Sequence, residues 1–228
     1  MKYQGQELDN FDKASIWRKY IFLNIKNYIK GSTLEVGAGI GSFTNNYKSL
    51  TSDITLSEID TDNLDFIKEK FKKDNFNFTS EQTKNINKNF DTIMYLNVLE
   101  HIENDNKEIA NAFEKLNPNG YLIILVPAHN ELYSKFDKAI GHFRRYDIDF
   151  FKKINLQRSK LIKLCYLDSA GYFLYYLNKV FFKEEVYPSK FKILIWDKIF
   201  TPLTFLLDKI LMYKFGKNIL YVIQKLDA

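Results

Sequence analysis

The stretch TLEVGAGIGSFT, residues 33–44, decides the fold. It places Gly37, Gly39 and Gly41 behind a short apolar run that contains one acid, Glu35, in a chain with nine glycines among 228 residues. A strand that ends in a glycine-rich turn and leads into a helix lets the backbone approach a ligand where a side chain would collide. Such a ligand lies against the helix N-terminus and the carboxyl ends of the strands. The stretch therefore predicts a ligand site at one edge of a parallel sheet.

Two acids near this turn narrow the class of ligand. A dinucleotide site uses G-x-G-x-x-G, but the third glycine position holds Ser42 here and the spacing is G-x-G-x-G. Glu35 also disfavours a pyrophosphate, because a carboxylate favours an ammonium or sulfonium group instead. Glu58 ends the next apolar segment, where an acid in doubly wound sheets accepts hydrogen bonds from a ribose diol. Together these residues favour an adenosine-type ligand over a bare tight turn and a solvated loop acid.

Apolar runs alternate with helical patterns through the first half of the chain. This alternation predicts an α/β fold with a Rossmann-like, doubly wound parallel sheet and helices on both faces. The second half is less regular and ends in another strand. The predicted strands are 31–37, 53–59, 75–80, 90–96, 121–127 and 218–226, and the predicted helices include 9–29, 61–73 and 104–116. Residues 190–214 are expected to form two helices that meet near Pro202.

Composition limits the class of protein. The length fits one domain, and Cys165 is the only cysteine, which fits a reducing compartment such as the cytoplasm. The net charge of +5 comes from dispersed lysines, which argues against a nucleic-acid partner. The late apolar stretch 199–207 is far shorter than the roughly 20 residues of a spanning helix, so we expect peripheral membrane contact at most. The pairs Asp197-Lys198 and Asp208-Lys209 lie about three helical turns apart and make this segment amphipathic.

Several motifs resemble those of a known enzyme family. LEVGAGIGSFT, SEID and YLNVLEHI resemble the first, second and fourth strand motifs of class I S-adenosylmethionine-dependent methyltransferases. ELDNFDKASIWRKY, LNPNGYLIILVPAHNELYSKFDKAIGHFRRY and GKNILYVIQK resemble further segments of a bacterial subgroup of that family. The resemblance implies a seven-stranded sheet whose last strand runs antiparallel. It divides the single domain, 1–228, into an N-terminal cap helix (1–30), a cofactor-binding half (31–128) and an acceptor-side half (129–228) with a helical insertion at about 171–215.

The resemblance also implies the cofactor and the residues that hold it. The cofactor would be S-adenosylmethionine, with S-adenosylhomocysteine as product. The glycine turn would line its methionine and ribose side, Glu58 would hold the ribose hydroxyls, and the end of the fourth strand would contact it from the other side. The implied cofactor-binding residues are Glu35, Gly37, Ala38, Gly39, Gly41, Glu58, Ile59, Leu96, Asn97 and Trp17. Many relatives place an aspartate at the adenine amine, and only Glu81 stands near that place here.

The acceptor side is predicted from the loop GHFRRY, residues 141–146. His142 changes protonation near neutral pH and is the candidate base that takes a proton from, or orients, the nucleophile. Arginine binds anionic groups through two-pronged hydrogen bonds, so Arg144 or Arg145 would hold an anionic handle, with Tyr146 beside it. In the structural alternative the arginines clamp Asp137, Asp147 or Asp149, and we expect one arginine in each role.

Two further histidines are assigned to the acceptor side. His101 either lies at the mouth of the site or caps the next helix. His129 follows the fifth strand, at the edge where α/β sheets place their chemistry.

The resemblance implies methyl transfer to a small-molecule acceptor, such as a glycan, a lipid-linked group or a secondary metabolite. The alternatives are an RNA or protein methyltransferase, a catalytically silent binding module, and a nicotinamide-dependent oxidoreductase. No Asn/Asp-Pro-Pro-aromatic turn follows the fourth strand, which disfavours methylation of a nucleic-acid base. No metal is expected, because Glu100, Glu103 and Asp105 read as the start of a helix. The acceptor, the atom that is methylated and the oligomeric state stay open.

Overall fold

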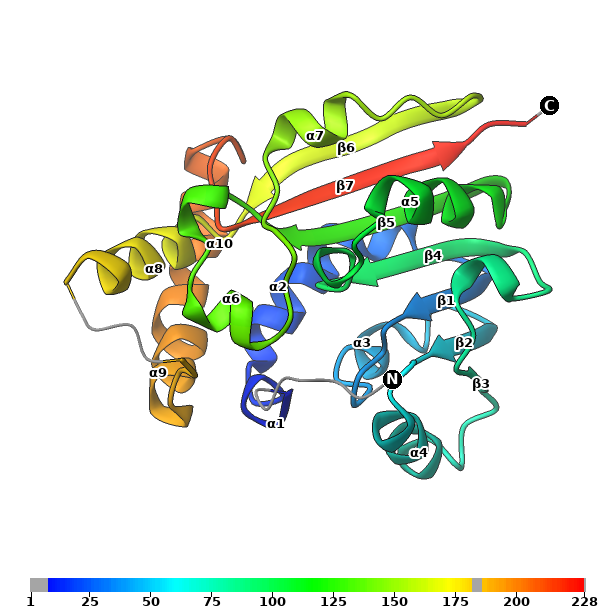
Figure 1. The fold of residues 1–228 in the computed structure, drawn as a ribbon, viewed down its shortest axis with the longest axis horizontal. Coiled ribbons are helices and arrows are strands. Elements are labelled where there is room, and N and C mark those ends of the chain that lie inside the picture. The colour runs from blue at the N-terminus through cyan, green and yellow to red at the C-terminus, as the bar shows by residue number, and fades with distance from the viewer. Residues whose placement is uncertain (1–7, 182–185, 228) are drawn as a thin grey trace.

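The computed structural model describes residues 8–181 and 186–227. Its strands are β1 (Ser32–Val36), β2 (Asp53–Ser57), β3 (Asn77–Thr79), β4 (Phe90–Leu96), β5 (Leu116–Pro127), β6 (Ser159–Leu167) and β7 (Asn218–Lys225). They form one seven-stranded sheet in the order β3-β2-β1-β4-β5-β7-β6 (Figure 1). The strands from β3 to β5 pair in parallel, whereas β7 is antiparallel to both β5 and β6. The predicted Rossmann-like sheet with an antiparallel last strand is confirmed.

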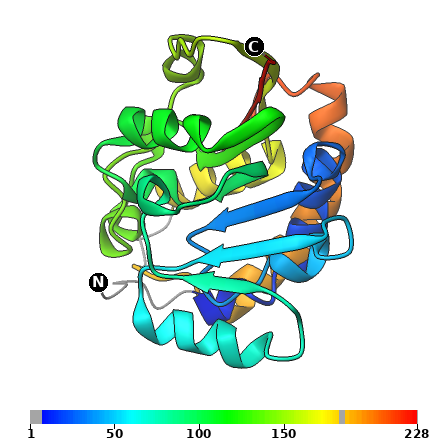
Figure 2. The same cartoon turned by 90° about the vertical axis from the view of Figure 1, so that its right-hand side faces the viewer.

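Helices cover both faces of this sheet (Figure 2). One face packs against α5 (Asp105–Glu114) and α7 (Ile148–Lys152), and the other against α2 (Ser15–Ile25), α3 (Thr44–Tyr47) and α4 (Thr61–Lys70). Successive side chains of a strand point to opposite faces. In β5, Leu122 and Ile124 therefore join the first core, and Ile123 and Leu125 join the second. A strand that is buried on both faces gives the continuous apolar run seen in the sequence.

The order of the strands reverses between β1 and β4. Ligands of open α/β sheets bind outside the carboxyl ends of the strands at such a point. The carboxyl edge carries the glycine turn after β1, Glu58 after β2, Asn97 after β4 and His129 after β5. The short helix α1 (Leu8–Phe11) lies next to the glycine turn, since the Leu8 side chain lies 3.7 Å from where a Cβ on Gly39 would be. Residues predicted as one site are therefore brought to one edge.

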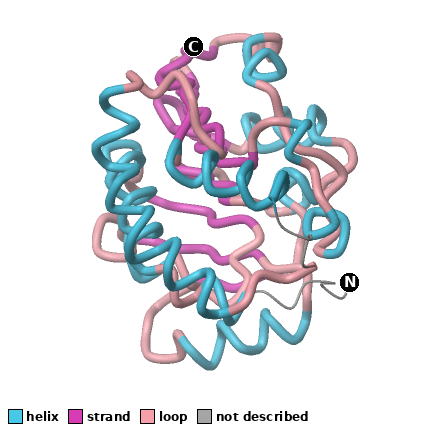
Figure 3. Tube along the Cα trace, turned by 90° about the vertical axis from the view of Figure 1, so that its left-hand side faces the viewer, coloured by secondary structure: helices cyan, strands magenta, loops and turns pink. Residues whose placement is uncertain are grey.

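The predicted insertion forms a group of helices at one end of the molecule, beside α2 and α6 (Lys135–Ala139) (Figures 1 and 3). It consists of α8 (Ser169–Phe181), α9 (Lys190–Ile195), a π-helical turn η5 (Trp196–Phe200) and α10 (Thr201–Ile210). The expected break near Pro202 is the junction of η5 and α10, where proline occupies the first turn of α10. Residues 1–7 of the predicted cap and 182–185 of the predicted insertion lie outside the described residues.

Two acids of the insertion do share one face, but it is the buried face. Asp197 accepts hydrogen bonds from the backbone N–H groups of Ile16 and Trp17 at the start of α2 (3.3 and 2.8 Å). Asp208 accepts from the backbone of residues 168 and 169 at the start of α8 (2.8 and 2.9 Å). A carboxylate at a helix N-terminus satisfies donors that have no partner within the helix. Asp197 therefore attaches the insertion to α2, and Asp208 joins α10 to the start of α8 within the insertion.

Short 3₁₀ helices complete the described elements: η1 (Lys26–Tyr28), η2 (Thr83–Asn85), η3 (Leu99–His101) and η4 (Asn130–Leu132). Within residues 8–181 and 186–227, none of the helices combines the length and the apolar character needed to cross a bilayer.

Candidate active site

The three glycines of the turn have two different reasons to be glycine. All three have positive φ angles, +64° at Gly37, +55° at Gly39 and +66° at Gly41, which favour glycine. A Cβ at Gly37 would lie 2.7 Å from Val98, and one at Gly41 would lie 2.5 Å from Phe71, so close packing excludes side chains there. Among the described residues, a Cβ at Gly39 would meet only the side chain of Leu8, at 3.7 Å. Gly39 therefore leaves space beside its backbone, as a ligand-approach position requires.

Glu35 lies beneath this turn and is buried. Its Oε2 accepts hydrogen bonds from Thr44 Oγ1 (2.8 Å) and from the Tyr47 hydroxyl (2.7 Å), both on α3. Burial raises the pKa of the Glu35 carboxyl to about 6, although the two hydroxyl hydrogen bonds oppose this shift. The carboxyl thus links β1 to the helix that follows the turn and contributes negative charge under the site.

Glu58 is held against the glycine turn, as the sequence predicts. Its Oε2 accepts from the Gly39 N–H (2.7 Å) and its Oε1 accepts from the Asp60 N–H (2.9 Å). Burial raises the pKa of Glu58, and these two N–H groups counteract that shift. Each carboxylate oxygen can accept more than one hydrogen bond, so both keep capacity for a diol. The turn and this acid form one preorganised unit.

The other predicted cofactor residues lie around this unit. Ala38 is buried and its N–H donates to the Ser57 carbonyl (3.0 Å), while Ile59 is 47% exposed beside Glu58. Leu96 is partly buried, and Asn97 has a positive φ of +57° with its N–H donated to the Leu125 carbonyl (2.8 Å).

Two further residues, the aromatic Trp17 and the acid Glu81, are predicted to contact the cofactor. Trp17 packs on Trp196 of the insertion, with ring centroids 5.9 Å apart, and its indole Nε1 is buried without a hydrogen-bond partner among the described residues. Tyr20, in contrast, is a core residue that donates its hydroxyl to Asp208. Glu81 is exposed, and its carbonyl accepts from Ser57 Oγ (3.0 Å). The contacts of Trp17 and Glu81 with a cofactor stay predictions.

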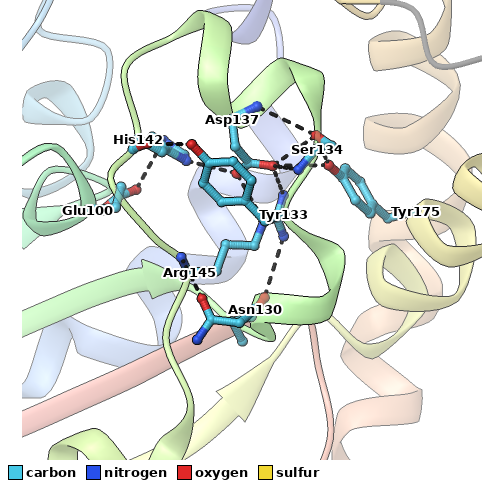
Figure 4. Close-up of polar contacts among 9 residues, drawn as sticks. Glu100, Asn130, Tyr133, Ser134, Asp137, His142, Arg145 and Tyr175 are labelled. Atoms are coloured by element: carbon cyan, nitrogen blue, oxygen red, sulfur yellow. Dashed lines mark hydrogen bonds and ion pairs between the residues drawn. The ribbon is translucent and has the colours of Figure 1, made fainter.

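His142 is fixed by a buried acid at the same edge of the sheet (Figure 4). Its Nδ1 lies 2.8 Å from Asp137 Oδ1, and Arg145 donates to both oxygens of that carboxylate (2.9 and 3.0 Å). Burial alone would raise the pKa of Asp137, but the bonds from His142 and Arg145 hold it well below its usual range. Because an ionised carboxylate only accepts, His142 Nδ1 carries the hydrogen. Its Nε2 therefore faces the site with a free lone pair when the ring is neutral.

That Nε2 points at a second buried acid, Glu100 on η3. Glu100 Oε1 lies 3.7 Å from His142 Nε2, and neither oxygen of Glu100 has a hydrogen-bond partner among the described residues. Burial raises the pKa of Glu100 to about 7. A carboxyl with such a pKa can exchange a proton near neutral pH. The three acids do not start one helix, since Glu100 lies on η3 and α5 begins at Asp105, and the Glu100 carboxyl is directed toward His142.

His101 joins this pair rather than capping a helix. Its ring meets the His142 ring edge-on, with centroids 4.6 Å apart. Burial, and to a smaller extent the nearby His142, lowers the pKa of His101 to about 4. The ligand atoms of Glu100, His101 and His142 lie within 4.8 Å of one another, so the group has donors suited to a metal ion, although the sequence predicted none. A second such group in the described part of the chain is His129, Glu131 and Asp147.

Both arginines hold aspartates, which is the role that the sequence predicts for one of them, and acceptor binding by the other stays a prediction. Arg145 is 3% exposed and clamps Asp137, which was one of the expected partners. Arg144 donates to Asp105 Oδ2 (2.6 Å) and to the Glu103 carbonyl (2.9 Å) instead of Asp147 or Asp149. Tyr146 is also buried, and its hydroxyl donates to Asp105 (3.0 Å). In this geometry the three side chains hold the loop, and the largely buried His142 is its functional group directed toward Glu100.

His129 lies apart from the His142 group, in an aromatic cluster. Its ring stacks on Tyr166 at 5.1 Å and meets Tyr172 edge-on at 4.9 Å, and its Nε2 lies 3.0 Å from the Gly216 carbonyl. The insertion does reach the His142 network. The Tyr175 hydroxyl on α8 donates to Ser134 Oγ (2.6 Å), and the Tyr175 ring lies 4.6 Å from the Arg145 guanidinium.

The fold and this site define a class I S-adenosylmethionine-dependent methyltransferase. Residues 13–170, more than half of the chain, match the family model described as a methyltransferase domain, and the chain belongs to that family. The open backbone at Gly39, the Glu58 carboxylate beside it and the buried negative charge of Glu35 fit S-adenosylmethionine, the methyl donor of this fold. A comparison with curated proteins finds no match for the sequence.

Solved structures share the fold at low sequence identity. N-methyltransferase NodS from Bradyrhizobium japonicum WM9, in complex with S-adenosylhomocysteine, has a TM-score of 0.62 and 12% identity over 98% of this chain and 94% of its own. The YcgJ protein from Bacillus subtilis has a TM-score of 0.61 and 13% identity over 92% and 99%. An S-adenosylmethionine-dependent methyltransferase from Clostridium acetobutylicum has a TM-score of 0.58 and 15% identity over 97% and 96%.

Proposed function

We propose that the chain transfers the methyl group of S-adenosylmethionine to a small-molecule acceptor whose nucleophile lies before Glu100 and His142. One observation supports this proposal: a buried acid that has no hydrogen-bond partner among the described residues faces a histidine held by Asp137, at the sheet edge that also carries Gly39 and Glu58.

The chain's own residues have a limited task in this reaction. The sulfonium of the cofactor supplies an activated methyl group, so displacement requires in-line positioning more than chemical assistance. A hydroxyl nucleophile must also lose its proton. His142 Nε2 or the Glu100 carboxyl can take that proton. His142 Nε2 lies 3.7 Å from Glu100 Oε1, and both atoms can still accept a hydrogen bond. Asp137 holds the imidazole in the required tautomer throughout.

The acceptor class is tested by methyl transfer against a panel. Purified full-length protein is incubated with isotopically labelled S-adenosylmethionine and, separately, with soluble glycans, lipid-linked glycans, small phenols and amines, total RNA and a protein extract. We expect label in a small-molecule or lipid-linked fraction, and none with Gly39→Ala. Label in RNA or protein alone would contradict the proposed acceptor class.

The cytoplasmic location stays a prediction, which fractionation of the source cells would test.

A further inference from the structure

The outer side of α9, η5 and α10 is apolar and exposed. The exposed fractions are 70% for Phe191, 56% for Ile199, 49% for Leu203, 61% for Leu206 and 65% for Ile210. Their spacing of three, four and eight residues places them on one side of a nearly continuous helical rod. We call these five residues the outer face. A contiguous apolar surface of this kind on a folded domain marks a binding surface more often than chance exposure.

The inner side of the same rod is buried. Ile193, Trp196, Asp197, Thr204 and Asp208 are buried against the rest of the chain. Asp197 and Asp208 bind the first turns of α2 and α8. The rod therefore cannot turn its outer face inward without breaking these contacts.

The charges on the rod point to an anionic partner. Residues 189–214 contain five lysines, at 190, 192, 198, 209 and 214, and two acids, Asp197 and Asp208. Both acids are buried, whereas all five lysines are exposed. Every exposed charge of this segment is therefore positive. An apolar stripe bordered by lysines is the pattern of helices that lie in the interface of a bilayer with anionic lipids.

We propose that the outer face binds the surface of a membrane that contains anionic lipids, with the apolar side chains among the acyl chains and the lysines at the headgroups. A second copy of the chain fits less well, because a two-fold contact places the same patch against itself and brings like charges together. The insertion also supplies Tyr175 to the Asp137 network, so the membrane-binding element is in contact with the proposed site, and we infer that the acceptor is lipid-linked. That last step alone rests on the proposed function.

The test is flotation of the full-length protein with vesicles, without cofactor or acceptor. Vesicles of phosphatidylcholine are compared with vesicles that also contain phosphatidylglycerol. Wild type should float with the anionic vesicles, and binding should fall with added salt. The variant Leu206→Ser with Ile210→Ser should lose at least about tenfold in partitioning, because two apolar side chains that would lie among the acyl chains are removed. The matched control is Phe66→Ser on α4, a side chain that is 53% exposed outside the outer face, and it should bind like wild type.

Three results would overturn the proposal. They are wild type that floats with neither vesicle, a double variant that floats as well as wild type, and a Phe66→Ser variant that loses as much binding as the double variant. Light scattering is run on the same samples, and a wild-type dimer that the double variant dissociates, in protein that binds no vesicle, would assign the outer face to self-association. Melting curves of the variants show whether each is folded. Since no methyl transfer is measured, failure of the proposed enzymatic function leaves this result unaffected.

Discussion

Glu35→Gln isolates the effect of one buried charge under the cofactor turn. Glu35 is buried, and its Oε2 accepts hydrogen bonds from Thr44 and Tyr47. Glutamine has nearly the same shape and keeps a carbonyl oxygen that can accept from both hydroxyls. The substitution therefore removes the titrating charge and little else.

The size and sign of the effect follow from the pKa of Glu35. Burial raises that pKa from its usual 4.5 to about 6 in the folded chain. Since one pKa unit corresponds to about 1.4 kcal/mol, the ionised form costs about 2 kcal/mol of folding free energy. Between the two pKa values the folded chain binds the proton more tightly than the unfolded chain. The contribution of Glu35 to stability therefore falls as pH rises from 4.5 to about 6, and it stays low above that.

The assay is urea unfolding of wild type and Glu35→Gln at several pH values. The difference between the two free energies of unfolding cancels the titration of groups that both chains share. From about pH 4 to about pH 7.5 this difference should shift by about 2 kcal/mol in favour of the variant. A difference that stays constant across this range, or shifts in favour of wild type, would refute the reasoning about the buried carboxyl.

Four further variants test the site. Glu58→Ala should weaken S-adenosylhomocysteine binding by about ten- to a hundredfold, since hydrogen bonds to a charged group are worth roughly 1.5–3 kcal/mol, and calorimetry that shows less than a twofold change would return Glu58 to a structural role. Gly39→Ala should abolish that binding in a chain that still unfolds cooperatively, and unchanged affinity would mean that no ligand approaches this backbone. His142→Ala should lower turnover by about 10²–10⁴-fold with nearly unchanged cofactor affinity, whereas wild-type rates from about pH 6 to 9 would exclude a proton-transfer role. Arg145→Lys should lower the melting temperature because it breaks the two-pronged clamp on a buried aspartate, and a raised Michaelis constant for the acceptor at unchanged stability would instead favour acceptor binding.

The parts of the fold that depend on local pattern were predictable from the sequence. The apolar runs at 90–96 and 121–127 are strands that are buried on both faces, and the glycine turn follows β1 as expected. The meeting of Gly39 and Glu58 was predictable too, because parallel strands bring their carboxyl ends to one edge.

Contacts between distant residues could not be read from the sequence. Gly37 and Gly41 are glycines because Val98 and Phe71 occupy the space of their side chains, and nothing near residues 37–41 indicates that. The partner of Arg144 is Asp105, which lies 39 residues away on another element, and not a neighbouring aspartate. Partners of this kind are chosen by the packing of whole elements.

One missed site residue did leave a signal. Glu100 is an acid inside the apolar run YLNVLEHI, as Glu35 is inside TLEVG. A buried acid is costly, so an acid within a buried run points to a specific role for the carboxyl. Glu103, in contrast, belongs to the polar stretch before α5. Treating Glu100 and Glu103 together as acids at a helix start hides the fact that only Glu100 lies in an apolar run.

The most direct test of the cofactor site is calorimetric titration of the full-length chain with S-adenosylhomocysteine, with NAD titrated separately under the same conditions. The glycine turn with Glu35 and Glu58 predicts saturable one-to-one binding of S-adenosylhomocysteine and no binding of NAD. Binding of NAD, or no binding of S-adenosylhomocysteine to the folded chain, would contradict the assignment of this edge of the sheet as the site of the methyl donor.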